Sequence, residues 1–154
     1  MFIFLVLISL ICVISYNTLR FRSERVDNTI SRESFDLDYQ SCVDKLSKAV
    51  QIKTISNSDY NKTDWKEFEK YRSFLRETFP LVHETMDLEI INTHSLVYRW
   101  KGNSKEKKPF IITAHMDVVP IEKGTEKDWK QPPFEGKIDD GYLWGRGTLD
   151  TKIH

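Results

Sequence analysis

Two short motifs in the sequence carry side chains suited to metal chemistry. His115 and Asp117 are two residues apart in the stretch Ala-His-Met-Asp-Val-Val-Pro, and Asp150 follows His115 by 35 residues. On a strand, residues i and i+2 point to the same side, so His115 and Asp117 would face one cleft. Imidazole is a good zinc ligand, and a carboxylate beside it fixes the orientation of the ring.

Each motif on its own also has an ordinary explanation. A surface histidine can lie beside an aspartate that caps a helix, with no metal involved. Asp150 comes shortly after Gly145-Arg146-Gly147, where it either caps a helix beginning at Thr151 or binds metal through its two oxygens. A phosphate-binding loop is excluded, because neither glycine-rich phosphate pattern occurs in the sequence.

A sheet and a hairpin are predicted to position these residues. Residues 109–114 form a compact apolar run that leads into His115, which is typical of a strand buried on both faces of an α/β sheet. Sites in such sheets lie at the carboxyl ends of the strands. Asp140-Gly141 predicts a hairpin between residues 134–138 and 142–144, because an Asp-Gly pair adopts the positive φ values of a tight turn.

Upstream of the predicted buried strand, the sequence predicts two helices and two strands. Apolar residues between positions 43 and 50 recur at helical spacing. Asp64 and Glu67 form a capping pair for a second amphipathic helix. The apolar alternation over residues 85–91 and 95–100 indicates two strands.

The N-terminus is an apolar run over residues 1–16, MFIFLVLISLICVISY. A helix over this run would be about 24 Å long, against roughly 30 Å for the hydrocarbon core of a bilayer. We therefore assign residues 1–19 to a signal peptide or a membrane anchor, 20–36 to a polar linker and 37–154 to the folded domain. Arginines after the run favour a cytoplasmic folded domain, whereas the glycosylation sequon Asn61-Lys62-Thr63 favours a luminal one.

Composition narrows the classes of function. The 154 residues include 23 Lys and Arg against 23 Asp and Glu, so the chain lacks the basic excess of a nucleic-acid binder. Two cysteines, Cys12 and Cys42, are too few for a disulfide scaffold. A hydrophobic content of 40% excludes a disordered polymer and is sufficient for a folded core.

Together, the two motifs resemble the aminoacylase and carboxypeptidase family of dinuclear zinc metallopeptidases. The resemblance rests on AHMDVVP followed by PPFEGKIDDGYLWGRGTLDTK, and it extends over residues 40–152. Vacuolar carboxypeptidase S and the N-acyl-aromatic-amino-acid hydrolases look most similar, and they carry an N-terminal membrane or signal segment. The resemblance implies an α/β catalytic domain with helices packed on a mixed, mainly parallel sheet.

The resemblance also implies roles for single residues. His115 matches a zinc ligand, Asp117 matches the catalytic carboxylate that orients it, and Asp150 matches the aspartate that bridges two zinc ions. In the family, a metal-activated water attacks the amide of a peptide or an N-acyl amino acid, and a glutamate takes its proton. This implies a hydrolase at a membrane, in the secretory or vacuolar lumen, or secreted.

The chain departs from the family pattern in what it lacks. The family's general-base glutamate, its remaining metal ligands and its dimerisation domain have no counterpart in these residues. Because a catalytic zinc normally takes three protein ligands, we expect residues 37–154 to be an incomplete N-terminal portion of the catalytic domain, inactive alone. His154 is not expected to replace a missing ligand. The alternative is a membrane-anchored, non-enzymatic truncated product.

Overall fold

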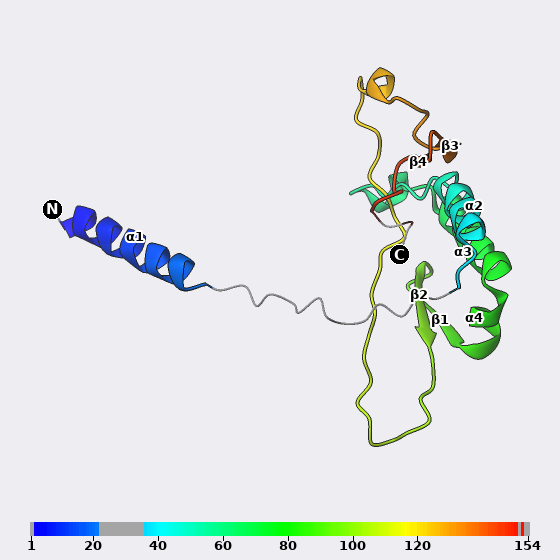
Figure 1. Ribbon diagram of the computed structural model, residues 1–154, viewed down its shortest axis with the longest axis horizontal. Helices are drawn as coiled ribbons and strands as arrows, with labels where there is room; N and C mark the ends of the chain where they lie inside the picture. The colour runs from blue at the N-terminus through cyan, green and yellow to red at the C-terminus, as the bar shows by residue number, and fades with distance from the viewer. Residues whose placement is uncertain (1, 22–35, 151, 153–154) are drawn as a thin grey trace. The chain divides into compact units, whose positions relative to one another are not determined.

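The computed structural model describes residues 2–21, 36–150 and 152, which fall into two units (Figure 1). The first unit contains α1 (Phe2–Arg20), whose large apolar side chains are exposed along its length. Within α1, the span Ile3–Arg20 is long and apolar enough to cross a membrane, a property that signal sequences share. Most of the predicted linker, residues 22–35, lies outside the described residues.

The second unit begins at Leu37 and is built from helices and two β-hairpins. Its helices are α2 (Tyr39–Val50), α3 (Trp65–Thr78) and α4 (Pro80–Thr85), with 3₁₀ turns at Tyr60–Lys62 and Glu126–Asp128. Its strands are β1 (Asp87–Ile91), β2 (Ser95–Arg99), β3 (Lys137–Asp139) and β4 (Tyr142–Trp144). The two helices and the strand segments predicted upstream of residue 100 are thus confirmed.

Aspartate side chains cap both long helices. Asp38 and Asp64 each accept a hydrogen bond from a backbone N–H in the first turn of α2 and α3, respectively. Glu67 does not complete the predicted capping pair, because its carboxylate instead accepts a hydrogen bond from the backbone N–H of Lys53 at 2.7 Å. This bond fastens the loop that follows α2 to the side of α3.

The core forms where α2 and α3 lie side by side (Figure 1). Ala49 of α2 and Ile52 of the following loop pack against Tyr71 of α3, and all three side chains are buried. Met116, from the predicted site motif, is half-buried against this cluster. The core therefore holds both the loop after α2 and the segment that carries the candidate ligands.

Both hairpins are antiparallel, and the second has the turn that its sequence predicts. β1 pairs with β2 along all five residues of each strand. β3 and β4 are joined by Asp140 and Gly141, whose φ angles are 52° and 75°. These positive angles are those of the tight turn that Asp-Gly pairs favour.

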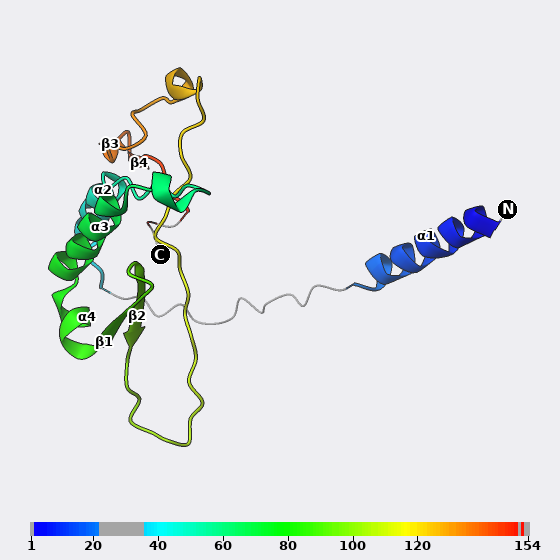
Figure 2. The ribbon, with the colours of Figure 1, turned by 180° about the vertical axis from the view of Figure 1, so that it is seen from behind.

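The prediction of a buried strand over residues 109–114 is wrong. This segment is irregular, and its apolar side chains at positions 110, 111 and 112 are 84%, 86% and 85% exposed. Seen from behind in Figure 2, it belongs to the long irregular stretch that follows β2. A buried parallel strand needs neighbours that pair with its backbone and cover both of its faces, and no described segment does so here.

For the same reason, the described residues contain no mainly parallel sheet. Both sheets in this part of the chain are two-stranded and antiparallel. Parallel pairing is limited there to a single bridge between Ile55 and Val118. That bridge lies just beyond the predicted strand and supports the candidate site.

Candidate metal centre

Backbone pairing with the loop after α2 holds the segment that carries His115. The N–H of Val118 donates to the carbonyl of Thr54 at 2.8 Å, and the N–H of Ser56 donates to the carbonyl of Val118 at 3.2 Å. The Thr54 hydroxyl also donates to the carbonyl of Met116 at 2.6 Å. Thr54 is completely buried, so these bonds anchor the segment to the core.

Asp150 lies on a turn that packs directly against the core. A Cβ at Gly145 would overlap a methyl group of Val50 in α2. A Cβ at Gly147, whose φ is 90°, would lie 2.9 Å from a methyl group of Val118. Both positions therefore need glycine, which lets the backbone approach the core closely and turn sharply before Asp150.

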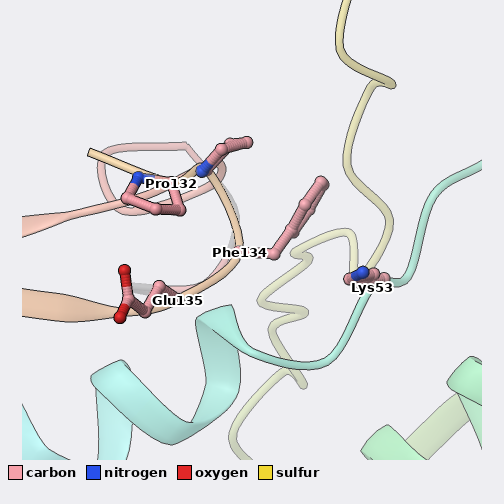
Figure 3. Close-up of a pocket in the computed structure, with 5 residues that line it drawn as sticks. Lys53, Pro132, Phe134 and Glu135 are labelled. Carbon is pink, nitrogen blue, oxygen red and sulfur yellow. The ribbon is translucent and has the colours of Figure 1, made fainter. Parts of the chain in front are cut away.

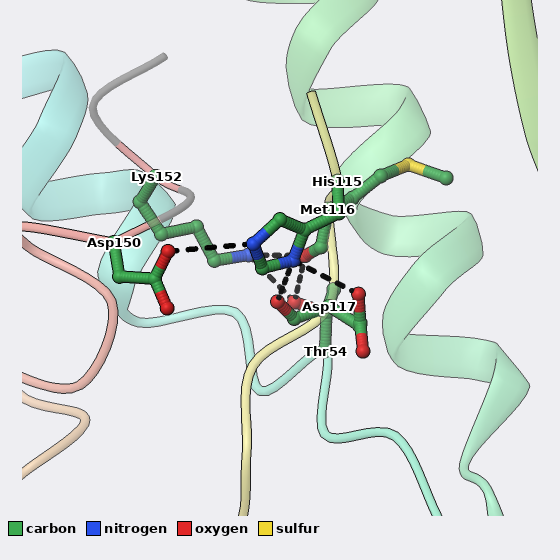
Figure 4. Close-up of polar contacts among 6 residues, drawn as sticks. All are labelled: Thr54, His115, Met116, Asp117, Asp150 and Lys152. Carbon is green, nitrogen blue, oxygen red and sulfur yellow. Dashed lines mark hydrogen bonds and ion pairs between the residues drawn. The ribbon is translucent and has the colours of Figure 1, made fainter. Parts of the chain in front are cut away.

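The structure brings the three site residues predicted from sequence together (Figure 4). His115 Nδ1 lies 3.0 Å from the carbonyl oxygen of Asp117 and 3.1 Å from its Oδ1. His115 Nε2 lies 3.4 Å from Oδ1 of Asp150. The ring therefore has a carboxylate at each nitrogen, and the side chains of His115 and Asp150 are 55% and 85% exposed, open to a solvent ion.

His115 and Asp117 shift each other's pKa. The hydrogen bond with Asp117 raises the pKa of His115 above its usual value, with burial opposing and Asp150 reinforcing the increase. Burial acts to raise the pKa of Asp117, but hydrogen bonds with Ser56 and His115 outweigh it and leave that pKa below its usual value. Asp117 is therefore ionised at neutral pH and favours a proton on Nδ1.

The geometry at Nε2 fits a zinc ion held between His115 and Asp150. Both oxygens beside Nδ1 are acceptors, so Nδ1 is the donor and Nε2 of the neutral ring is an acceptor. Nε2 and Oδ1 of Asp150 are then two acceptors facing each other, and a proton or a metal ion between them removes their repulsion. Tetrahedral zinc with ordinary bond lengths places such nitrogen and oxygen ligands about 3.4 Å apart, the distance seen here.

The described part of the chain contains no complete metal site. Among residues 2–21, 36–150 and 152, no three or more His, Cys, Asp or Glu side chains are grouped so as to hold a metal ion. Asp117 contacts the Nδ1 side of His115, away from Nε2. This contact leaves Nε2 as the ring nitrogen that faces Asp150.

The other histidines do not join this site. His94 stacks on Trp65 with ring centroids 3.8 Å apart, and Nε2 of His83 is hydrogen-bonded to the Tyr98 hydroxyl at 2.9 Å. His154 lies outside the described residues, as does Thr151, the first residue of the helix that Asp150 was alternatively expected to cap.

Sequence reasoning missed Lys152, which is buried behind the site with 6% of its surface exposed. Its Nζ donates to Thr54 Oγ1 at 2.6 Å and to the Met116 carbonyl at 3.3 Å, and lies 3.8 Å from the ring centroid of Tyr71. Burial lowers the pKa of Lys152 to about 8, with the charge of Asp117 opposing the shift. A lysine in a Thr-Leu-Asp-Thr-Lys stretch gives no sign of burial, because lysines are mostly exposed.

Two open clefts lie elsewhere on this unit. One of about 530 Å³ is lined by residues of the loop before β3 and by Lys53, whose Nζ lies 5.6 Å from the ring centroid of Phe134 (Figure 3). The other, of about 320 Å³, is lined by Lys53, Ile55 and Glu67 among others. Neither cleft is lined by His115 or Asp150, so neither is the candidate metal centre.

Sequence comparisons connect the site to known hydrolases. Residues 111–154 match Peptidase family M20/M25/M40. The chain is 40% identical over 156 residues to "Probable carboxypeptidase S-like 2" of Dictyostelium discoideum, which covers 95% of this chain and 29% of the relative. It is 38% identical over 119 residues to carboxypeptidase S of Saccharomyces cerevisiae, which covers 73% of this chain and 21% of the relative.

A third relative is named for a different activity. The N-fatty-acyl-amino acid synthase/hydrolase of Bos taurus is 40% identical over 111 residues, which covers 70% of this chain and 21% of the relative. The chain thus spans less than a third of the length of each of these curated relatives. All three carry names of enzymes that act on peptide-like or acyl-amino acid compounds.

Proposed function

From the resemblance of the chain to the N-terminal part of the M20/M25/M40 peptidases, we propose that it contributes to a zinc-dependent amide hydrolase. The substrate class is a peptide with a free C-terminus or an N-acyl amino acid, by analogy with the relatives. The observation that carries the proposal is the arrangement around His115. One carboxylate lies at each ring nitrogen, and Nε2 is 3.4 Å from Oδ1 of Asp150, the separation expected of two ligands of one tetrahedral zinc ion.

In this proposal, His115 and Asp150 hold zinc, and Asp117 positions the histidine. When bound, zinc lowers the pKa of a coordinated water and polarises the amide carbonyl. Asp117 accepts a hydrogen bond from the Nδ1–H of His115, so the Nε2 lone pair faces Asp150. Asp150 has a second carboxylate oxygen available for a second zinc ion in a complete dinuclear site.

We further propose that this span is an incomplete catalytic domain and is inactive alone. His115 and Asp150 are two ligands, and a catalytic zinc normally takes three from protein. The remaining ligands and the general base would come from the two thirds or more of the relatives' length that the chain does not span. The same region would supply the strands of the mainly parallel sheet.

We propose that α1 is a signal peptide or membrane anchor and that the unit from Leu37 is luminal or secreted. The exposed apolar surface of α1 and the exposed Asn61 of the sequon support this placement. Digestion with an N-glycosidase should lower the apparent mass of the wild-type chain from eukaryotic cells, but not that of Asn61→Gln. An unchanged wild-type mass, with the folded unit accessible to cytosolic protease, would support the opposite orientation indicated by the arginines.

The enzymatic proposal is tested by comparing residues 23–154 with the same chain extended along its reading frame. Zinc content and hydrolysis of N-acyl-phenylalanine and a dipeptide are measured for both. We expect only the extended form to bind about two zinc ions per chain and to hydrolyse either substrate. Asp150→Asn should abolish activity of the extended form, whereas Asp140→Asn, a matched change in the β3–β4 turn, should preserve it.

Two outcomes would contradict this proposal. Hydrolysis by residues 23–154 alone would show that the span is catalytically sufficient. Absence of metal binding from both forms would leave His115 and Asp150 without a metal role and would favour the membrane-anchored, non-enzymatic product.

A further inference from the structure

We infer that Lys152 is a positioning residue, whose buried ammonium ties the turn that carries Asp150 to the segment that carries His115 and Asp117. The consequence for zinc rests on the proposed function, because it assumes that His115 and Asp150 are ligands. The tie between the two segments is a property of the fold that can be tested without metal.

Three segments meet at the ammonium of Lys152 (Figure 4). Nζ donates to Oγ1 of Thr54, in the loop after α2, and to the carbonyl oxygen of Met116, between the two site residues. The Thr54 hydroxyl in turn donates to the same Met116 carbonyl. The ring of Tyr71 in α3 covers the ammonium, and all of these contacts lie in or against the core.

Lys152 also closes the turn that presents Asp150. Its backbone N–H donates to the carbonyl of Gly147 at 3.0 Å. A Cβ at Gly147 would lie 3.0 Å from Cγ of Lys152, so the lysine stem packs directly on that glycine. The turn is therefore fixed through both the backbone and the side chain of Lys152, and Asp150 lies inside it.

A packing role alone does not explain why this residue is a lysine. A methionine of similar length would fill the space without the cost of burying a charge. In the part of the chain that the structure describes, Lys152 forms no salt bridge within 4.0 Å that would offset this cost. The ammonium instead directs its donors at a hydroxyl and a carbonyl and its charge at an aromatic face, which fixes three segments in direction as well as distance.

The metal-free test is amide hydrogen exchange on the full chain in detergent micelles. In Lys152→Met we expect the Val118 amide, which donates to Thr54, to exchange at least about tenfold faster, while amides in the middle of α3 keep their protection. Unchanged exchange at Val118 would overturn the inference, because the ammonium would then not hold the two segments together.

If Lys152→Met fails to fold, a second pair of variants tests whether the hydrogen bonds of Lys152 hold the two segments together. Thr54→Val removes the hydroxyl that links Lys152 to Met116, and Thr54→Ser keeps it. We expect faster exchange at Val118 in Thr54→Val and near wild-type exchange in Thr54→Ser. Equal exchange in the two variants would contradict a role for this hydrogen-bonded link.

The consequence for the site is tested in the chain extended along its reading frame, by titrating Zn²⁺ against the ring resonances of His115. We expect about tenfold weaker zinc binding in Lys152→Met, as for other residues that position a ligand, and wild-type binding in the exposed control Lys123→Met. Equal affinity in Lys152→Met and wild type would overturn the positioning role. If the wild type binds no zinc, the proposed metal function fails, and the exchange experiment still decides whether Lys152 ties the segments.

Discussion

His94 and His115 have opposite surroundings within one folded unit. His94 is stacked on the indole of Trp65, with the rings inclined by 12°, and its Nε2 lies 3.3 Å from the Tyr60 hydroxyl. The side chain of His115 is 55% exposed, and the carboxylates of Asp117 and Asp150 lie beside its two nitrogens. One ring is used as an aromatic surface, and the other presents two nitrogens with defined donor and acceptor roles.

The difference follows from where each ring is attached. His94 is in the turn between β1 and β2, and it brings that hairpin against α3, where Arg72 also donates to the Thr93 carbonyl. His115 lies on the irregular segment beside the Asp150 turn, and Asp150 reaches its ring from 35 residues further along the chain. The groups at the ring nitrogens therefore distinguish His115, the proposed ligand, from His94, which packs against an aromatic ring.

The largest expected difference between the two histidines is in zinc binding. His115→Ala removes a proposed ligand and should weaken binding by more than about 100-fold, beyond the effect typical of residues that only orient a ligand. His94→Ala should leave the zinc affinity within about twofold of wild type. Isothermal titration of the chain extended along its reading frame measures both, and comparable losses in the two variants would remove the distinction.

A smaller effect is expected for the carboxylate that orients His115. Asp117→Asn keeps an oxygen acceptor for Nδ1 but loses the charge, so zinc binding should weaken by about tenfold. The matched change Asp139→Asn in β3 should have no effect on zinc. A loss as large as that of His115→Ala would instead indicate that Asp117 contacts the metal directly.

For the free energy of unfolding, the order should be reversed, with His94→Ala having the larger effect and His115→Ala the smaller. His94→Ala removes the stacked pair with Trp65 and should lower the free energy of unfolding by about 1 kcal/mol. His115 is more than half exposed, so His115→Ala should change stability by less than about 0.5 kcal/mol. Urea denaturation of the two variants tests this, and a larger destabilisation by His115→Ala would be contrary to the structure.

The smallest expected effect is on the titration of metal-free His115. The pKa of His115 is raised in the folded protein. The interaction of His115 with the carboxylates therefore contributes its full stabilisation below the ordinary histidine pKa. This stabilisation is lost as the pH rises through the pKa of the folded protein. Asp117→Asn should lower this pKa more than Asp150→Asn, because the hydrogen bond with Asp117 contributes most. A titration followed by NMR would refute this ranking if Asp150→Asn gave the larger decrease.

The ligand candidates were predictable from sequence because their signal is local and chemical. A histidine two residues before an aspartate, a later aspartate after Gly-Arg-Gly, and the resemblance carried by both motifs indicated the three residues that the structure brings together. The Asp-Gly turn and the Asp64 cap were equally predictable, because each depends on a residue and its immediate neighbours.

The features that sequence reasoning missed depend on distant partners. The apolar run at residues 109–114 predicts a buried strand, but burial of such a strand requires neighbouring strands that are not among the described residues. The spacing of Asp64 and Glu67 predicts a capping box, yet Glu67 accepts a hydrogen bond from the backbone N–H of Lys53. The sequence around Lys152 is typical of a surface lysine, and only the fold brings this residue to Thr54, 98 residues earlier in the chain.

The most direct test of the account is to identify the nitrogen of His115 that binds zinc. Long-range ¹⁵N–¹H spectra of the chain extended along its reading frame, recorded during a Zn²⁺ titration, distinguish the two ring nitrogens. The account predicts that zinc shifts the Nε2 resonance, that Nδ1 stays protonated beside Asp117, and that Asp150→Asn suppresses the response. Zinc binding at Nδ1, or no response of His115 in the wild-type chain, would contradict the proposed metal centre.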